Sequence, residues 1–104
     1  MSITARIVNG ITAMSEMKIR YKEEKQIKEY TIQPHLLGKL KSTGNLVLSA
    51  FDTSDKAKAS WKTFLLNKVL SAELTDKSFD AAAPNYNPED KRMETVISAI
   101  PSIE

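Results

Sequence analysis

The chain has 104 residues, the size of one domain, and 41% hydrophobic with 27% charged residues is typical of a folded globular protein. The absence of cysteine excludes disulfides, thiolate metal sites and a cysteine nucleophile. No apolar run reaches the roughly 18 residues that cross a bilayer, and residues 1–10 lack a signal-peptide pattern. We therefore expect a cytoplasmic protein with no membrane association.

Charge is distributed unevenly along the chain, although the formal net charge is only +2. Residues 1–68 hold twelve Lys/Arg against six Asp/Glu, whereas residues 69–104 hold three against seven. A basic portion followed by an acidic one is compatible with an anionic partner.

Residues 2–14 are expected to form an amphipathic helix. Ser2 is a suitable N-cap, and Gly10 weakens the pattern in the middle. The apolar residues at helical spacing are Ile3, Ile7, Val8, Ile11 and Met14.

The hydrophobic period then changes to two, which indicates strands. Met17, Ile19 and Tyr21 alternate with basic residues, and a polar turn at 23–26 leads to a second strand over 27–32. Pro34 is expected to interrupt the ladder. Extended structure resumes at 35–41, with Gly38 as a bulge or a point of close approach.

Three more short strands are expected beyond the turn at residues 42–45. They cover residues 46–51, 61–66 and 69–74, and the polar segment 52–60 forms a loop between the first two.

Residues 88–100 are expected to form a C-terminal helix. Asn87, Pro88, Glu89 and Asp90 resemble a helix start. The apolar stripe of this helix consists of Met93, Val96, Ile97 and Ile100. It either caps an open end of the sheet or forms an interface with a second copy or another protein.

The expected fold is therefore α+β and mainly β: a helix, about five short antiparallel strands closed into a small barrel, and a second helix. Closure is expected because it removes exposed strand edges. Residues 1–83 would hold the helix and the barrel, and residues 84–104 the helix that packs on it, within one domain.

Four segments resemble the WYL domain, a ligand-sensing module of bacteria and phages with an SH3/Sm-like barrel. The first is the I-x-Y strand, at Ile19 and Tyr21, and the second is a P-H-x-L element at Pro34, His35 and Leu37. The third segment retains Leu48, Ala50, Phe51 and Asp52, and the fourth retains Lys62, Phe64, Leu66, Asn67, Lys68 and Val69. The similarity covers about residues 3–75.

The chain also departs from that family. The name-giving triplet is Leu46-Val47-Leu48, without its Trp and Tyr, and lysine replaces arginine at positions 62 and 68. An ammonium cannot reproduce the bidentate contacts of a guanidinium, which weakens the inference about the ligand. We expect no counterpart in these 104 residues of the DNA-binding domain to which the WYL domain is usually fused. The resemblance therefore implies a standalone regulatory or accessory protein, of the kind that phages and mobile elements carry, not a complete transcription regulator.

Six residues are candidates for ligand binding: Lys62, Lys68, His35, Tyr21, Arg20 and Lys39. The resemblance puts Lys62 and Lys68 at a positive pocket, and strand alternation puts Lys62 on the face of Phe64, at the barrel mouth. Each candidate also has a structural alternative. The two lysines of the resemblance could be solvated, and the other basic residues could belong to an ordinary charged face interleaved with glutamates. The tyrosine could be a packing residue, and His35 could form a structural hydrogen bond.

We expect a non-enzymatic module that recognises an anionic ligand, a nucleotide or single-stranded nucleic acid, through a lysine-lined surface. No nucleophile-elbow or phosphate-loop pattern is present, and one histidine cannot build a metal site, so neither a cofactor nor a metal is expected. The alternative is an SH3-like protein-interaction adaptor, or a homo-oligomeric accessory protein, with no nucleic-acid role.

Overall fold

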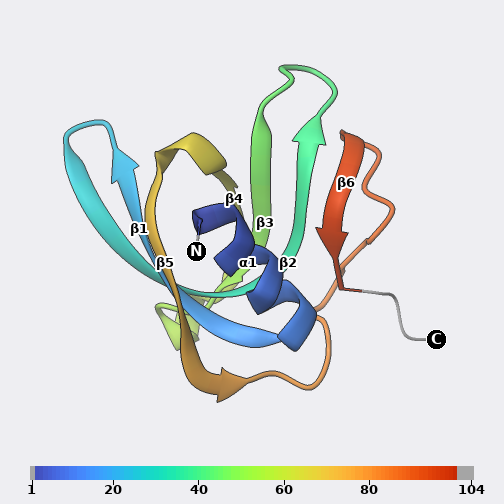
Figure 1. Cartoon of the computed structure of the whole chain (residues 1–104). Coiled ribbons are helices and arrows are strands. Elements are labelled where there is room, and N and C mark those ends of the chain that lie inside the picture. The colour runs from blue at the N-terminus through green and yellow to red at the C-terminus, as the bar shows by residue number, and fades with distance from the viewer. Residues whose placement is uncertain (1, 101–104) are drawn as a thin grey trace.

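The computed structural model describes residues 2–100 and shows one helix on a single antiparallel sheet (Figure 1). The elements in chain order are α1 Ile3–Ala13, β1 Ser15–Glu23, β2 Gln26–Leu40, β3 Leu46–Asp52, η1 Lys56–Lys58, β4 Ser60–Leu65, η2 Leu66–Lys68, β5 Val69–Ser78 and β6 Met93–Ala99. The predicted mainly β class, the N-terminal helix and the first five strands are confirmed. Part of the predicted segment 84–104, residues 101–104, lies outside the described range.

Helix α1 forms for the reasons that the sequence suggested. The Ser2 hydroxyl accepts a hydrogen bond from the first turn, and Ile7 and Ile11 bury the apolar stripe against the sheet. Gly10 also has a packing reason, because a Cβ atom there would lie 2.5 Å from the Met17 sulfur. Glycine has a conformational cost inside a helix, but its lack of a side chain permits close contact between α1 and β1 at this position.

Strand β2 continues through Pro34, contrary to the predicted interruption. Residues Ile32–Lys39 pair with β3 on one edge. On the other edge β2 pairs with β1 up to Ile32 and with β6 from Leu36 onward. The N–H and C=O of Thr31 both bond toward the β3 side, so alternation points the nitrogen of Pro34 to the opposite edge. Pro34 therefore lacks its N–H on the edge of β2 where the pairing changes from β1 to β6. No ladder hydrogen bond is lost there.

The predicted C-terminal helix at 88–100 is wrong, because Met93–Ala99 is strand β6, antiparallel to β2. Asn87 and Asp90 use their side-chain oxygens to accept backbone N–H groups two residues further on, which closes turns and starts no helix. The β-branched run Thr95–Ile97 then favours extended backbone.

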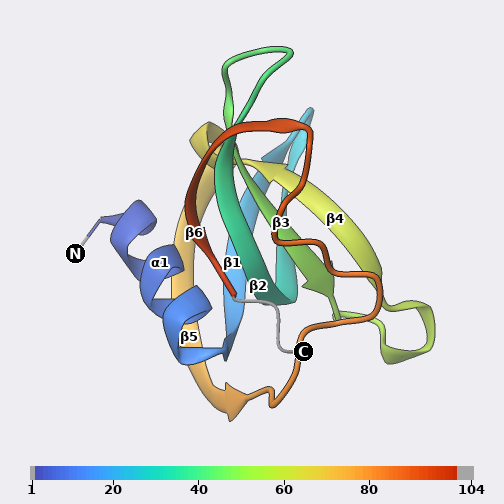
Figure 2. The ribbon, with the colours of Figure 1, turned by 90° about the vertical axis from the view of Figure 1, so that its right-hand side faces the viewer.

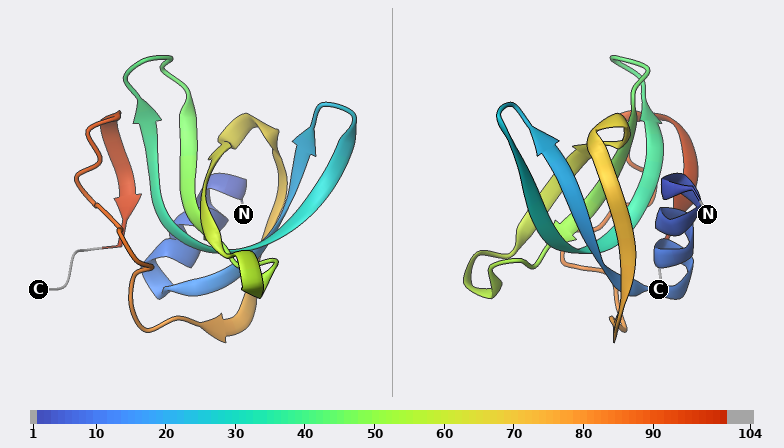
Figure 3. Two further views of the ribbon diagram at one scale, coloured as in Figure 1. Left: turned by 180° about the vertical axis from the view of Figure 1, so that it is seen from behind. Right: turned by 60° about the vertical axis from the view of Figure 1, so that its left-hand side comes forward.

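The predicted closed barrel is also wrong. The sheet order is β4-β3-β2-β1-β5, with β6 beside β2, and its two end strands β4 and β5 do not pair. Figure 3 shows a strongly curved but open sheet. A side chain takes the place of the strand pairing that would close the barrel. The Leu65 N–H in β4 donates to the Tyr21 hydroxyl of β1 at 3.0 Å, and not to a neighbouring strand. The hydroxyl satisfies the N–H that strand pairing would otherwise need.

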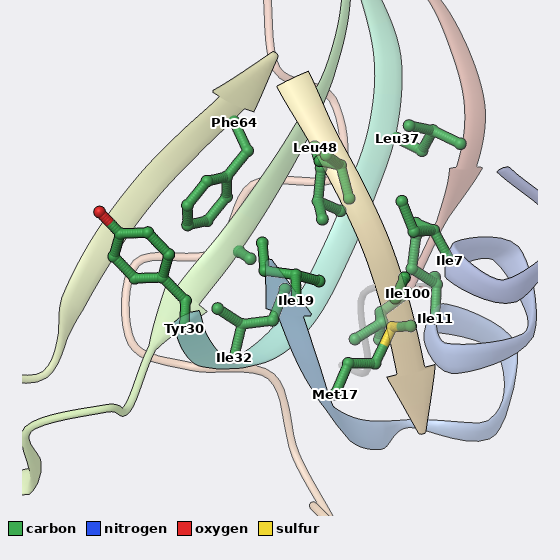
Figure 4. Packing of buried hydrophobic residues seen from close by; sticks show 13 residues of the cluster. Ile7, Ile11, Met17, Ile19, Tyr30, Ile32, Leu37, Leu48, Phe64 and Ile100 are labelled. Atoms are coloured by element: carbon green, nitrogen blue, oxygen red, sulfur yellow. The ribbon is translucent and has the colours of Figure 1, made fainter. Parts of the chain in front are cut away.

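The main core fills the inner face of the sheet beneath α1. Figure 4 shows isoleucines of α1 meeting the inward side chains of β1, β2 and β3, with aromatic rings toward the other end. The buried cluster includes Ile7, Ile11, Met17, Ile19, Tyr30, Ile32, Leu37, Leu48, Phe64 and Ile100. A smaller cluster of Leu36, Val47 and Met93 packs separately. Val47 alternates with the inward Leu48, so this second cluster lies on the outer face.

Within the described residues, no helix has the length and apolar character needed to span a membrane.

Candidate ligand-binding site

A hollow of about 320 Å³ lies over the outer face of the sheet, next to the connector between β5 and β6. Its floor crosses three strands, since Leu36 pairs with Ser49 and Ser49 pairs with Thr63. Residues 85–92 of the connector supply much of its wall. Figure 2 shows the connector running from the end of β5 past β3 and β4 and rising to the start of β6, which then runs back down.

Two stacked aromatic rings form one side of the hollow. Trp61 and Tyr86 have ring centroids 6.1 Å apart and planes 17° apart. The Trp61 indole N–H donates to the Pro84 carbonyl at 2.7 Å, and the Tyr86 hydroxyl donates to the carbonyl of Ile100. These bonds hold the connector against β4 and the end of β6, so the aromatic side is fixed before any ligand arrives.

An ion pair lies at the connector end of the hollow. The Arg92 guanidinium donates from Nε to both Asp90 oxygens, at 3.1 and 3.2 Å, and from Nη2 to Oδ2 at 2.7 Å. These hydrogen bonds lower the pKa of Asp90 below its usual value and raise the pKa of Arg92. The Arg92 side chain is 57% exposed and that of Asp90 only 19%. Asp90 therefore orients one edge of the guanidinium and leaves Nη1 for another acceptor.

Further donor groups face the same space. Asn87 accepts the Glu89 N–H through Oδ1, which leaves its NH₂ group to donate. Within residues 2–100, the hydroxyls of Ser49 and Thr63 form no hydrogen bond with protein. Guanidinium, amide and hydroxyl donors thus surround a hollow with an aromatic side, an arrangement that suits an anionic or acceptor-rich ligand.

Lys62 lines this hollow, but its ammonium is engaged with other groups. Its Nζ lies 3.4 Å from Asp52 and 5.1 Å from the centroid of the Tyr30 ring, on the inward face that also carries Phe64. Burial acts to raise the pKa of Asp52, but hydrogen bonds from Ser54 and Lys62 lower it overall. The predicted placement of Lys62 beside Phe64 is confirmed, and its charge is already balanced there.

Tyr30 forms the centre of the cationic cluster at this end of the sheet. Its ring has the ammonium groups of Lys28 and Lys62 at 5.0 and 5.1 Å, and its hydroxyl donates to Glu23. Burial, followed by the bond to Glu23, raises the pKa of Tyr30 to about 12. The phenol keeps its proton, so the cluster is a structural arrangement of paired charges.

Lys68 lies in a different hollow, of about 550 Å³, between η2 and the β1–β2 hairpin. That hollow is lined by Tyr21 and residues 22–26, which mix lysines with glutamates. Tyr21 packs edge-to-face on Phe64 at 5.1 Å, in addition to accepting the Leu65 N–H. The two lysines expected at a common pocket thus line separate hollows.

Arg20 and Lys39 line neither hollow. Arg20 is exposed on β1 opposite Glu29 of β2, and Lys39 lies 3.4 Å from Glu94 of β6. Both basic residues face acidic neighbours on adjacent strands, which supports the interpretation of a solvated charged face.

His35 is fully buried and holds the connector to β2. The Gln33 carbonyl lies 2.7 Å from Nδ1, and the Ala83 N–H donates to Nε2 at 2.9 Å. A carbonyl accepts and an N–H donates, so these partners fix the neutral tautomer with the proton on Nδ1. Burial lowers the pKa of His35. Both ring nitrogens are occupied, which favours the structural hydrogen bond over contact with a ligand.

Sequence reasoning missed most of the residues that line the hollow beside the connector. The sequence prediction did not single out Trp61, and it placed Asn87 and Asp90 in a helix start. The usable signal was the polar and aromatic run at 85–92, which has two asparagines next to Tyr86 and a pair of opposite charges two residues apart. Within the described residues, no group of three or more His, Asp or Glu could hold a metal ion.

Comparisons of the chain with protein-family models, curated proteins and solved structures found no match. Membership of the WYL family therefore stays a prediction from the four short segments.

Proposed function

We propose that this protein is a non-enzymatic binding module whose ligand carries a carboxylate or phosphate on a flat, partly apolar group. The main support is the convergence of the half-exposed Arg92 guanidinium with unoccupied hydroxyl and amide donors beside the stacked Trp61 and Tyr86. This proposal keeps the anionic ligand expected from the sequence and moves its site from the lysines to the hollow beside the connector.

The charged groups at this site favour binding over catalysis. The pKa of Asp90 is lowered and that of Arg92 is raised, so both stay ionised near neutral pH. His35 is fully buried with both ring nitrogens bonded. A general acid or base works best with a pKa near the working pH, and neither Asp90 nor Arg92 has one.

The volume of the hollow favours a small ligand. About 320 Å³ lies at the lower end of the range for small-molecule sites, which is about 300–1,000 Å³. A mononucleotide or an aromatic carboxylate suits this space, with the ring against the aromatic side and the anion at Arg92.

The test uses benzoate and adenosine monophosphate as probes. Trp61 is the only tryptophan in the chain, so its fluorescence reports binding directly, and calorimetry gives the affinity. Arg92→Ala should weaken binding of at least one probe by about tenfold or more, because hydrogen bonds to charged groups contribute about 1.5–3 kcal/mol. Lys91→Ala is the matched control, since it removes a neighbouring exposed charge outside the hollow.

Two outcomes would overturn this assignment. The first is that neither benzoate nor adenosine monophosphate binds at millimolar concentration. The second is a loss of affinity in Lys68→Ala that equals or exceeds the loss in Arg92→Ala, because that result would return the site to the hollow beside the β1–β2 hairpin.

A further inference from the structure

Strand β4 is an end strand of the sheet, and the hollow adjoins it. The order β4-β3-β2-β1-β5 leaves β4 with one neighbour, β3. The three consecutive residues Trp61, Lys62 and Thr63 all line the hollow. A strand that added to β4 would therefore run alongside this space.

The backbone groups on the outer edge of β4 can be assigned by alternation. The Leu65 N–H points away from β3, since it donates to the Tyr21 hydroxyl of β1. Backbone groups alternate in direction along a strand, so Trp61 and Thr63 also direct their N–H and C=O outward. Among residues 2–100, Thr63 forms no backbone–backbone hydrogen bond outside the strand ladder, and its alternation with Leu65 turns these groups away from the ladder with β3. The middle of β4 thus presents an unpaired donor and acceptor.

Strands β5 and β6 also have a single neighbour each, and β5 differs in this respect. Arg6 of α1 reaches the sheet there, and its guanidinium donates to the Ala72 carbonyl at 3.4 Å. A cationic side chain across a strand is a known means of blocking further pairing. Open backbone and a donor-lined hollow occur together at β4.

We propose that β4 receives an extended peptide segment of a partner protein, whose acidic side chain enters the hollow at Arg92. This inference rests on the proposed function, because the same donors bind the carboxylate. The added strand would lie about 4.7–4.9 Å from β4, with alternate side chains on the face that carries Trp61 and Thr63. Main-chain bonds to Thr63 supply affinity, and the hollow supplies specificity for the acid.

The chemistry of the lining limits what can enter. A hollow of about 320 Å³ has room for a carboxylate side chain of the added strand. Its donors are Arg92 Nη1, the Asn87 amide and the hydroxyls of Ser49 and Thr63, which favour an acceptor, and the Asp90 carboxylate in the same lining is already bonded to Arg92.

The test compares a small anion with a peptide. The peptide probe is a blocked pentapeptide that alternates serine and valine around a central glutamate, and benzoate is the small probe. Trp61 fluorescence gives both affinities, and amide hydrogen exchange reports protection of the Thr63 N–H. The central glutamate should bind at least about tenfold tighter than glutamine, as expected for a charged hydrogen bond.

Two variants separate the backbone contact from the side-chain contact. Thr63→Pro removes the outward N–H, a change that a strand edge tolerates, and Thr63→Val is matched to it because both lack the hydroxyl. We expect equal benzoate affinity in the two variants, and about tenfold weaker peptide binding in Thr63→Pro. N-methylation of the peptide on its bonding edge should have the same effect.

The outcomes distinguish the two proposals. If benzoate binds and the peptide does not, or if Thr63→Pro and Thr63→Val bind the peptide equally, strand addition is wrong and the anion site stands. If neither of these probes nor adenosine monophosphate binds, the proposed function fails as well. A free protein that is already dimeric, with a protected Thr63 amide, would show that a second copy occupies β4 and would overturn the inference.

Discussion

His35 connects two parts of the molecule through a ring that stays uncharged. Its nitrogens bond a carbonyl of β2 and an N–H of the connector, and the rings of Trp61, Phe79 and Tyr86 surround it at 4.8–5.3 Å. Protonation would place a second N–H against the Ala83 N–H. The buried ring therefore links the position of the connector to pH.

Stability should decrease as the pH falls below about 6.5. Burial lowers the pKa of His35 in the folded state, so the unfolded chain takes up the proton first. The stabilisation that the neutral His35 ring provides is complete above pH 6.5, the pKa of the histidine in the unfolded chain. It is lost as the pH falls toward the lower pKa of the folded state. Urea midpoints at pH 7.5, 6.5 and 5.5 measure this loss. His35 is the only histidine, so no other imidazole contributes.

The control for that measurement is His35→Gln, whose amide can bond both partners and does not titrate. It should be less stable than the parent at pH 7.5 because it packs less well. Its urea midpoint should then change little down to pH 5.5. An equally steep decline in the variant would assign the pH dependence to other groups.

At the scale of elements, β6 depends on a close approach to β2. A Cβ atom on Gly38 would lie 2.7 Å from the Thr95 carbonyl oxygen, a backbone atom that cannot rotate away. The sequence marked Gly38 as a bulge or a close-approach point, and the structure confirms both, with a register shift between Leu37 and Gly38.

Gly38→Ala should cost about 1–3 kcal/mol of unfolding free energy, the usual range for overpacking a tight contact. Amide exchange of β6 should accelerate more than that of β1. Gly44→Ala provides the comparison: Gly44 has φ +75, so alanine is strained there, but its built Cβ contacts only a lysine side chain. This second variant should destabilise without selectively loosening β6. If the β6 amides exchanged equally fast in the Gly38→Ala and Gly44→Ala variants, the proposed role of the close contact between Gly38 and Thr95 would be wrong.

The elements that could be predicted are those whose signal is local. The helix capped by Ser2 and the alternating strands carry their pattern within a few residues, and all were found. Strand β6 was missed because residues 87–90 have helix-start composition but close turns instead. Its extended form is set by pairing with β2, which is distant in sequence and gives no local sign.

At the scale of the whole molecule, stability should come from the inner face of the curved sheet. Leu48 is fully buried there, and Leu70, on β5, is 44% exposed. Leu48→Ala should cost about 2–5 kcal/mol, whereas Leu70→Ala should cost well under half of that. Urea unfolding of the two variants measures the difference. Similar costs would show that the apparent core does not dominate.

The candidate site could be predicted only in part. Lys62 was singled out and does line the hollow, but the lysines expected to converge there do not. Whether the lysines converge depends on how far the sheet curls round on itself. At Leu65 the N–H is bonded to the Tyr21 hydroxyl, so the sheet does not close by strand pairing there. The wall residues Tyr86 and Arg92 reach the sheet through a connector anchored by long-range bonds to Trp61 and His35. No periodicity encodes such contacts.

Strand β2 belongs to both halves of the sheet, with β1 along its first part, β6 along its last, and β3 across the change of partner. Neither half can detach and leave the other intact, because each would take away a section of the same strand. Local openings that split the molecule at Pro34 are therefore suppressed, and the slowest-exchanging amides on either side of that residue should belong to one cooperative unit.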